Sequence, residues 1–211
     1  KYVDILLVGD SLGTAIYGMK NTQSVTLNHM KEHGRTVYNN SSKPFTIIDM
    51  PYQTYTNNQN ALINAKKLLS YTKCQSIKLE VNENHLKLVS YLSKRKINVT
   101  SHIGVRPQEF KDFSKIRIVG KKKSERNKLI NLALRLEDSG TCILLLECID
   151  KEAAKEISSK VRIPTIGIGS SINCDGQILV VNDILGLSPN FNKPKFVKTY
   201  KNLSINVRKA I

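Results

Sequence analysis

Four short apolar segments of this chain each lead into an acidic residue. These residues are Asp10 after LLVG, Asp49 after FTII, Glu80 in SIKLE and Glu147 in ILLLE. Side chains alternate between the two faces of a strand, so each acid shares a face with the residue two positions before it. Because parallel strands end at one edge of a sheet, we expect the four carboxylates to converge there.

Carboxylates gathered in this way repel one another, which raises their pKa values. A hard divalent cation relieves the repulsion, and Mg²⁺ combines a few carboxylates with water and substrate oxygens. Lys78 lies two residues before Glu80 and therefore points to the same side, where a carboxylate of the protein or of a substrate would pair its charge. His102 ends another strand, in VTSHIG, and is expected in the same pocket. The residue types thus predict a divalent cation site.

Each of these residues also has a simpler interpretation. Asp10 could cap a following helix, and Asp49, which precedes Met50 and Pro51, could belong to a turn. Lys78 could extend to solvent, and His102 could be an ordinary core histidine. The coincidence of four strand-end acids favours the site, because the simpler explanations would all have to hold at once.

The elements that position these residues alternate between strands and helices. Apolar runs predict strands at residues 3–9, 45–49, 76–80, 97–103, 142–147, 163–168 and 177–182. Apolar residues spaced three or four apart predict helices at residues 26–37, 58–71, 83–94, 124–139 and 150–160. Such repeats indicate an α/β fold with a parallel sheet and external helices. An open doubly wound sheet and a (β/α)8 TIM barrel short of one strand both fit this pattern. GDSLGTAIYG matches the dinucleotide-binding fingerprint poorly, which weakens the interpretation as a Rossmann fold.

The composition excludes some classes of protein. The 211 residues suit one domain, and no apolar run is long enough to cross a bilayer. The first residues, KYVDILLVGD, lack signal-peptide features, and the four cysteines without a CxxC pair indicate a cytoplasmic protein. A net charge of +16 on its own suggests nucleic-acid binding, which remains the alternative from another class. Because the basic residues are scattered and no aromatic residues alternate with them, we expect neither a nucleic-acid nor a membrane partner.

Nine motifs in a fixed order carry a family resemblance. They are DILLVGDSLG (4–13), VTL (25–27), DMP (49–51), IKLE (77–80), SHIGVRPQ (101–108), LLEC (145–148), IPTIGIG (163–169), DGQILVVNDILG (175–186) and PKFVK (194–198). Together they closely resemble the ketopantoate hydroxymethyltransferase (3-methyl-2-oxobutanoate hydroxymethyltransferase) family of pantothenate biosynthesis. The resemblance covers essentially the whole chain.

The resemblance implies a fold, a reaction and an assembly. The fold would be a (β/α)8 barrel of the phosphoenolpyruvate/pyruvate superfamily, with residues 1–211 as a single domain that lacks the first strand and a C-terminal tail. The reaction would move a one-carbon unit from 5,10-methylenetetrahydrofolate to 3-methyl-2-oxobutanoate, giving 2-dehydropantoate. One Mg²⁺ per subunit and a homo-oligomer, commonly a decamer, are also implied.

The resemblance also assigns roles to residues. Asp10 and Asp49 would be Mg²⁺ ligands, and Glu80 would complete the metal environment. Asp10, Ser11, Asp49 and Lys78 would hold the 2-oxo acid, and Glu147 would accept its proton. The strand-end pattern points to the same acids independently.

Several loops depart from the family pattern. Ser114, Lys115 and Ile116 stand where a Gly-Gly-Tyr element is usual, and Asn182 stands where a histidine is usual. The metal and base positions are intact. The altered loops keep a second enzyme hypothesis open, a folate-independent, Mg²⁺-dependent 2-oxo acid lyase or mutase of the same superfamily.

Overall fold

The protein is an α/β structure built on one curled parallel sheet. The computed structural model describes residues 3–41, 43–188 and 195–211, so Pro194 of the last motif lies outside the described residues. The sheet contains β1 (Ile5–Val8), β2 (Phe45–Asp49), β3 (Ser76–Glu80), β4 (Val99–Gly104), β5 (Thr141–Glu147), β6 (Thr165–Ile168) and β7 (Gly176–Gln177). These strands pair in chain order and all pairs are parallel. Across the described residues, no pairing joins β1 to β7.

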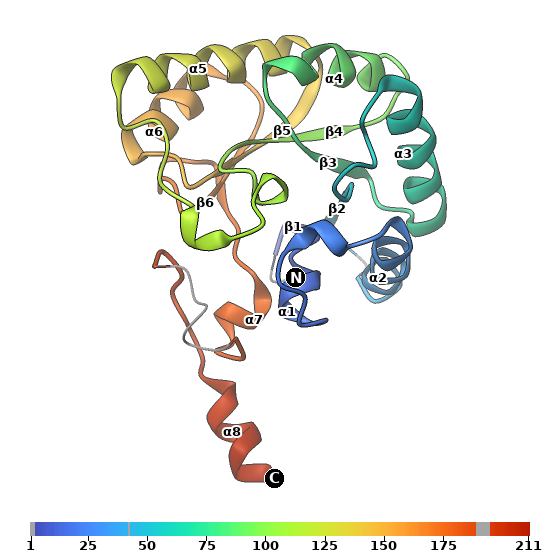
Figure 1. Ribbon diagram of the computed structural model, residues 1–211, viewed down its shortest axis with the longest axis vertical. Coiled ribbons are helices and arrows are strands. Elements are labelled where there is room, and N and C mark those ends of the chain that lie inside the picture. The colour runs from blue at the N-terminus through green and yellow to red at the C-terminus, as the bar shows by residue number, and fades with distance from the viewer. Residues whose placement is uncertain (1–2, 42, 189–194) are drawn as a thin grey trace.

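Helices follow the strands, and several of them cover the outer face of the sheet. They are α1 (Leu12–Ala15), α2 (Leu27–Asn39), α3 (Asn58–Thr72), α4 (Leu86–Ser93), α5 (Lys123–Asp138), α6 (Lys151–Lys160), α7 (Val181–Ile184) and α8 (Leu203–Ala210). Figure 1 shows α2 to α6 as an arc around the sheet. No helix in the described ranges is long and apolar enough to cross a membrane.

The predicted helices are confirmed to within a few residues, and their ends have local causes. The side chains of Thr26, Asn57 and Asp150 accept hydrogen bonds from the first-turn amides of α2, α3 and α6. Gly140 follows α5 with φ +93°, a conformation that favours glycine. The predicted helix 83–94 is divided into a 3₁₀ turn, η2 (Glu83–His85), and α4.

One predicted strand is largely wrong. The apolar run at residues 177–182 forms only the end of β7, and α7 begins at Val181. Val181 is 60% exposed, so this run does not continue into the core. A short apolar run fits a strand or a helix equally well, which is why its length alone misled the prediction.

The two faces of the sheet pack differently, and this confirms the predicted alternation. Ile48 belongs to the large core between sheet and helices, whereas Ile47 lies in a small cluster with Ile143 and Ile166 on the inner face. Asp49 shares the inner face with Ile47 because it lies two residues further along β2. The same alternation places Ile77 and Leu79 in the outer core and turns Lys78 and Glu80 inward.

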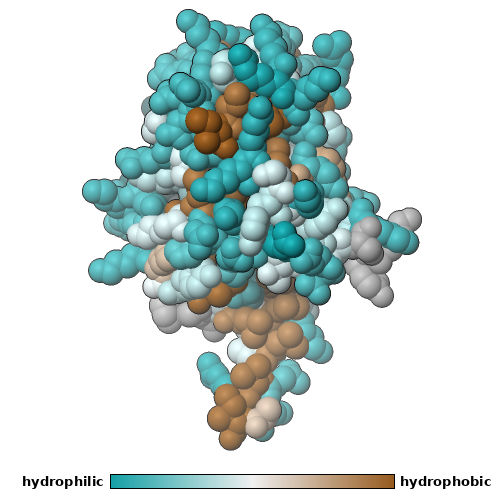
Figure 2. All heavy atoms as spheres, turned by 90° about the vertical axis from the view of Figure 1, so that its right-hand side faces the viewer, coloured by the Kyte–Doolittle hydropathy of each residue, from teal (hydrophilic) through white to brown (hydrophobic). Residues whose placement is uncertain are grey.

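The C-terminal helix α8 extends away from the rest of the molecule (Figure 1). None of its residues is buried, and Ile205 and Val207 are about half exposed. Figure 2 shows this apolar surface below a body that is mostly hydrophilic.

Candidate active site

The strand register brings the predicted residues to one edge of the sheet. Asp49 at the end of β2 is paired with Lys78 of β3, and Glu80 at the end of β3 is paired with His102 of β4. Glu147 at the end of β5 is paired with Gly104. Asp49, Glu80 and Glu147 are the last residues of their strands, at the edge where parallel α/β folds place their active sites. Lys78 lies two residues before Glu80 on the same face. The predicted convergence of the acids on this edge is confirmed.

Asp10, Asp49 and Lys78 form the first half of the site. Lys78 Nζ lies 2.6 Å from Asp49 Oδ1, and the Asp10 backbone N–H donates to Asp49 Oδ2 at 2.9 Å. The three residues are 5%, 2% and 5% exposed, respectively. Lys78 therefore does not extend to solvent. Asp10 is not a helix cap either, since α1 begins after Ser11 without a side-chain capping bond.

Glu80, His102 and Glu147 form the second half. His102 Nδ1 lies 3.8 Å from Glu80 Oε1, and His102 Nε2 lies 3.4 Å from Glu147 Oε2. His102 is fully buried, and neither ring nitrogen has a hydrogen-bond partner within the described residues. It is not an ordinary core histidine with satisfied nitrogens. Burial, with the nearby Lys78 charge, holds its pKa well below the usual range, so the imidazole is neutral.

Gln108 joins the two halves, and the site prediction missed it. Its side-chain Nε2 donates to Asp10 Oδ2 at 2.7 Å, and its backbone N–H donates to Glu80 Oε2 at 3.0 Å. The residue lies in a 3₁₀ turn, η3 (Pro107–Glu109), after β4. Its place at the end of the motif SHIGVRPQ was the one available signal.

Ser11 lies at the rim of the site. It is partly buried and directly precedes α1. A Cβ built on Gly9 would lie 3.1 Å from Ser11 Oγ and 3.5 Å from Asp49 Oδ2, so both side chains adjoin Gly9. The hydroxyl is thus near the aspartate pair.

Three acids of the site, Asp10, Glu80 and Glu147, have raised pKa values. Burial first, and then the nearby Asp49, raise the pKa of Asp10 to about 7. Burial raises the pKa of Glu147 to about 8, although Lys78 opposes the shift. The pKa of Glu80 is also raised well above its ordinary value by burial. Burial lowers the pKa of Lys78, but Asp49, Glu80 and Asp10 outweigh it, so the net shift is upward and the ammonium stays charged.

The donor set fits a hard divalent cation that takes two protein carboxylates. Asp49 Oδ1 has no hydrogen-bond partner in the described residues besides its ion pair with Lys78. No group of three or more His, Cys, Asp or Glu side chains in the described part of the chain could hold a metal ion by itself. Mg²⁺ commonly takes one or two carboxylates and completes its shell with water and substrate oxygens.

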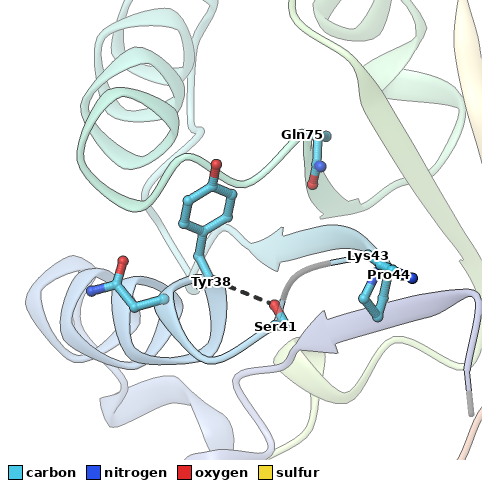
Figure 3. A pocket seen from close by; sticks show the side chains of 6 residues that line it. Tyr38, Ser41, Lys43, Pro44 and Gln75 are labelled. Carbon is cyan, nitrogen blue, oxygen red and sulfur yellow. Dashed lines mark hydrogen bonds between the residues drawn. The ribbon is translucent and has the colours of Figure 1, made fainter. Parts of the chain in front are cut away.

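A separate pocket lies at the opposite ends of the strands. It is lined by Tyr38, Asn39, Ser41, Lys43, Pro44 and Gln75, near the starts of β2 and β3 (Figure 3). The Ser41 hydroxyl donates to the Tyr38 carbonyl at 3.5 Å on its edge. None of the strand-end acids lines this pocket, so it is separate from the candidate site.

Comparison with solved structures first gives the class of fold. The chain is similar to a solved structure of 2,3-dimethylmalate lyase, a member of the PEP mutase/isocitrate lyase superfamily, with a TM-score of 0.60 and 12% identity. That match covers 85% of this chain and 62% of the lyase chain. At this identity the likeness establishes the α/β fold.

Sequence comparison then gives the family. Residues 1–211 match the family profile described as ketopantoate hydroxymethyltransferase. The 3-methyl-2-oxobutanoate hydroxymethyltransferase of Pelagibacter ubique is 42% identical over 210 residues, and the match covers 100% of this chain, to the nearest per cent, and 80% of the relative. The protein of the same name from Anaplasma marginale is 39% identical over 211 residues, which are 76% of its length. The chain therefore belongs to the ketopantoate hydroxymethyltransferase family and is an enzyme of the transferase class.

Proposed function

We propose that this enzyme transfers a hydroxymethyl group from 5,10-methylenetetrahydrofolate to 3-methyl-2-oxobutanoate, giving 2-dehydropantoate for pantothenate synthesis. The 2-oxo acid is the substrate in the names of relatives 39–42% identical to the chain. The observation that carries the proposal is the constellation of Asp10, Asp49, Lys78 and Glu147 at one sheet edge. It combines a cation site, a fixed positive charge and a separate carboxylate.

The first half of the site is proposed to bind the 2-oxo acid. Asp10 and Asp49 would hold Mg²⁺, with Glu80 completing its environment through water. When bound, Mg²⁺ supplies a Lewis acid that favours the enolate of the substrate. Lys78 contributes a permanent ammonium beside Asp49, which suits the substrate carboxylate or the enolate oxygen. The Ser11 hydroxyl, at the rim, would donate to a substrate oxygen.

Glu147 is proposed as the base that removes the C3 proton. Its side chain is 16% exposed and its pKa is raised to about 8, close to the range in which general bases act efficiently. The proton passes from C3 to a Glu147 oxygen, and the electron pair left on C3 forms the new C–C bond to the one-carbon unit. The two C–N bonds that hold this carbon to folate break, which leaves tetrahydrofolate, and water supplies the oxygen and proton of the new hydroxyl group. His102, a neutral imidazole whose Nε2 lies 3.4 Å from Glu147 Oε2, would line the pocket beside this base.

The wider architecture is also part of the proposal. We infer that the curled sheet belongs to a (β/α)8 barrel and that residues 1–211 lie within a single domain. The family suggests a cytoplasmic homo-oligomer, with a decamer as the specific expectation.

A second candidate is a folate-independent lyase or mutase acting on a related 2-oxo acid. It is favoured by the similarity of the fold to a lyase and by the altered loop at Ser114. The test is to incubate the protein with Mg²⁺ and 3-methyl-2-oxobutanoate, with and without 5,10-methylenetetrahydrofolate, and to detect 2-dehydropantoate by mass spectrometry. The transferase requires the folate for any product. Turnover of the 2-oxo acid without folate would support the second candidate instead.

A further inference from the structure

Gln108 is a buried polar residue to which the proposed reaction assigns no role. It is 2% exposed, and Pro107 before it sets the start of the turn η3. Beyond its bonds to Asp10 and Glu80, its Nε2 also donates to the Met50 carbonyl at 3.0 Å. Its own backbone carbonyl accepts from Gln23 Nε2 at 2.9 Å. One residue thus contacts the ends of β1, β2 and β3.

The orientation of the Gln108 amide is fixed by its partners. The Met50 carbonyl can only accept, so the amide nitrogen must face it and Asp10. The amide oxygen then faces Tyr55, whose hydroxyl donates to it at 2.6 Å. Burial and the nearby carboxylates raise the pKa of Tyr55, so this hydroxyl keeps its proton. Tyr55 therefore orients Gln108, and Gln108 orients Asp10.

The contacts with Gln108 engage one oxygen of each carboxylate. Asp10 uses Oδ2 for Gln108, and Glu80 uses Oε2 for the Gln108 backbone. A carboxylate held by one oxygen keeps a single rotamer and presents its other oxygen in a defined direction. In metal sites, hydrogen-bond partners of the ligating side chains orient those side chains in this way.

We propose that Gln108, oriented by Tyr55, is a positioning residue that fixes the Asp10 and Glu80 carboxylates for a divalent cation and the 2-oxo acid. The inference rests on the proposed function, because it gives these carboxylates that task. Gln108 itself touches neither the substrate nor the cation.

The test measures Mn²⁺ affinity by electron paramagnetic resonance, together with KM and kcat for C3 proton exchange of 3-methyl-2-oxobutanoate. Gln108→Met keeps the length and the backbone bond to Glu80 but removes the amide. We expect Mn²⁺ to bind about 10–100-fold more weakly, the usual effect of losing such a partner. The loss should appear in Mn²⁺ affinity and KM more than in kcat, because the proposed base, Glu147, is not in contact with Gln108.

Two further variants separate positioning from packing. Tyr55→Phe removes only the hydroxyl and should weaken Mn²⁺ binding about 2–10-fold, the value of one hydrogen bond. If Tyr55 acts through Gln108, the double variant binds Mn²⁺ as Gln108→Met does, without a further loss. Gln75→Met is the matched control, since Gln75 accepts from the Thr46 amide at the other end of the sheet, and it should leave Mn²⁺ affinity unchanged.

The outcomes are distinguishable from those of the proposed function. Wild-type protein that binds no Mn²⁺ and exchanges no proton would overturn the proposed function, and the inference with it. If the wild-type protein is active and a folded Gln108→Met variant binds Mn²⁺ as tightly as the wild type does, the inference alone is overturned. If that variant does not fold, Tyr55→Phe decides: unchanged affinity and KM would overturn the inference, and the expected loss would support it.

Discussion

The buried ion pair between Lys78 and Asp49 allows a quantitative test of the site's electrostatics. The two side chains are 6% and 2% exposed, and Nζ and Oδ1 are 2.6 Å apart. Lys78→Met leaves Asp49 buried beside Asp10 without its cation. Breaking a buried pair in this way costs about 3–5 kcal/mol of unfolding free energy. In a chain of this size, each kcal/mol of lost unfolding free energy lowers Tm by about 2–4 °C, so Tm should fall by roughly 6–20 °C.

The assay is urea unfolding at neutral pH without added metal, and a second variant isolates the cause. Lys78→Met/Asp49→Asn removes both charges while keeping an oxygen that accepts from the Asp10 amide. It should recover at least half of the lost free energy.

Lys160→Met is the matched control, because it breaks an ion pair with Glu156 in which both side chains are well exposed, at 47% and 38%. Exposed pairs of this kind commonly contribute nothing measurable, so this variant should unfold as the wild type does. A loss below about 1 kcal/mol for Lys78→Met would refute the reasoning, since it would mean that the pair is solvated.

Three further predictions follow from the residues around the pair. Glu147→Gln should slow C3 deprotonation by roughly 10²–10⁴-fold in an NMR exchange assay, and near wild-type exchange would remove Glu147 from that role. Because Glu147 must be ionised to accept a proton and its pKa is about 8, the exchange rate should rise with pH up to that value and level off above it; a flat profile would contradict this assignment. Gly104→Ala should lower the unfolding free energy by at least about 2 kcal/mol, because φ is +96° and a Cβ would collide with the Glu147 backbone oxygen. Gly18→Ala, at φ +64° with open space around it, is its control and should cost about 1–2 kcal/mol in the same unfolding measurement; equal costs would contradict the collision.

The strand-end acids could be predicted from sequence because side chains along a strand alternate between its two faces with a period of two residues. Once residues 45–49 and 76–80 are recognised as strands, alternation places Asp49 with Ile47 and Glu80 with Lys78. Parallel pairing then brings the ends of neighbouring strands to one edge. The family motifs add the chemistry to these positions.

Gln108 could not be found in the same way. It lies in a turn, where no period relates one side chain to the next, and its partners are up to 98 residues away in the chain. Its role depends on how the turn folds back over the strand ends. The run at residues 177–182 failed for a related reason, because residues 178–180 form no regular element and Val181, which is 60% exposed, begins α7 instead of continuing a core strand.

The most direct test of the account is proton NMR of 3-methyl-2-oxobutanoate in D₂O with this protein, without folate, before and after adding Mg²⁺. The account predicts that the C3 proton signal disappears only when Mg²⁺ is present and that Glu147→Gln abolishes most of this loss. A protein that is folded and binds Mg²⁺ but leaves the C3 proton in place would contradict the assignment of these strand-end residues to enolate chemistry.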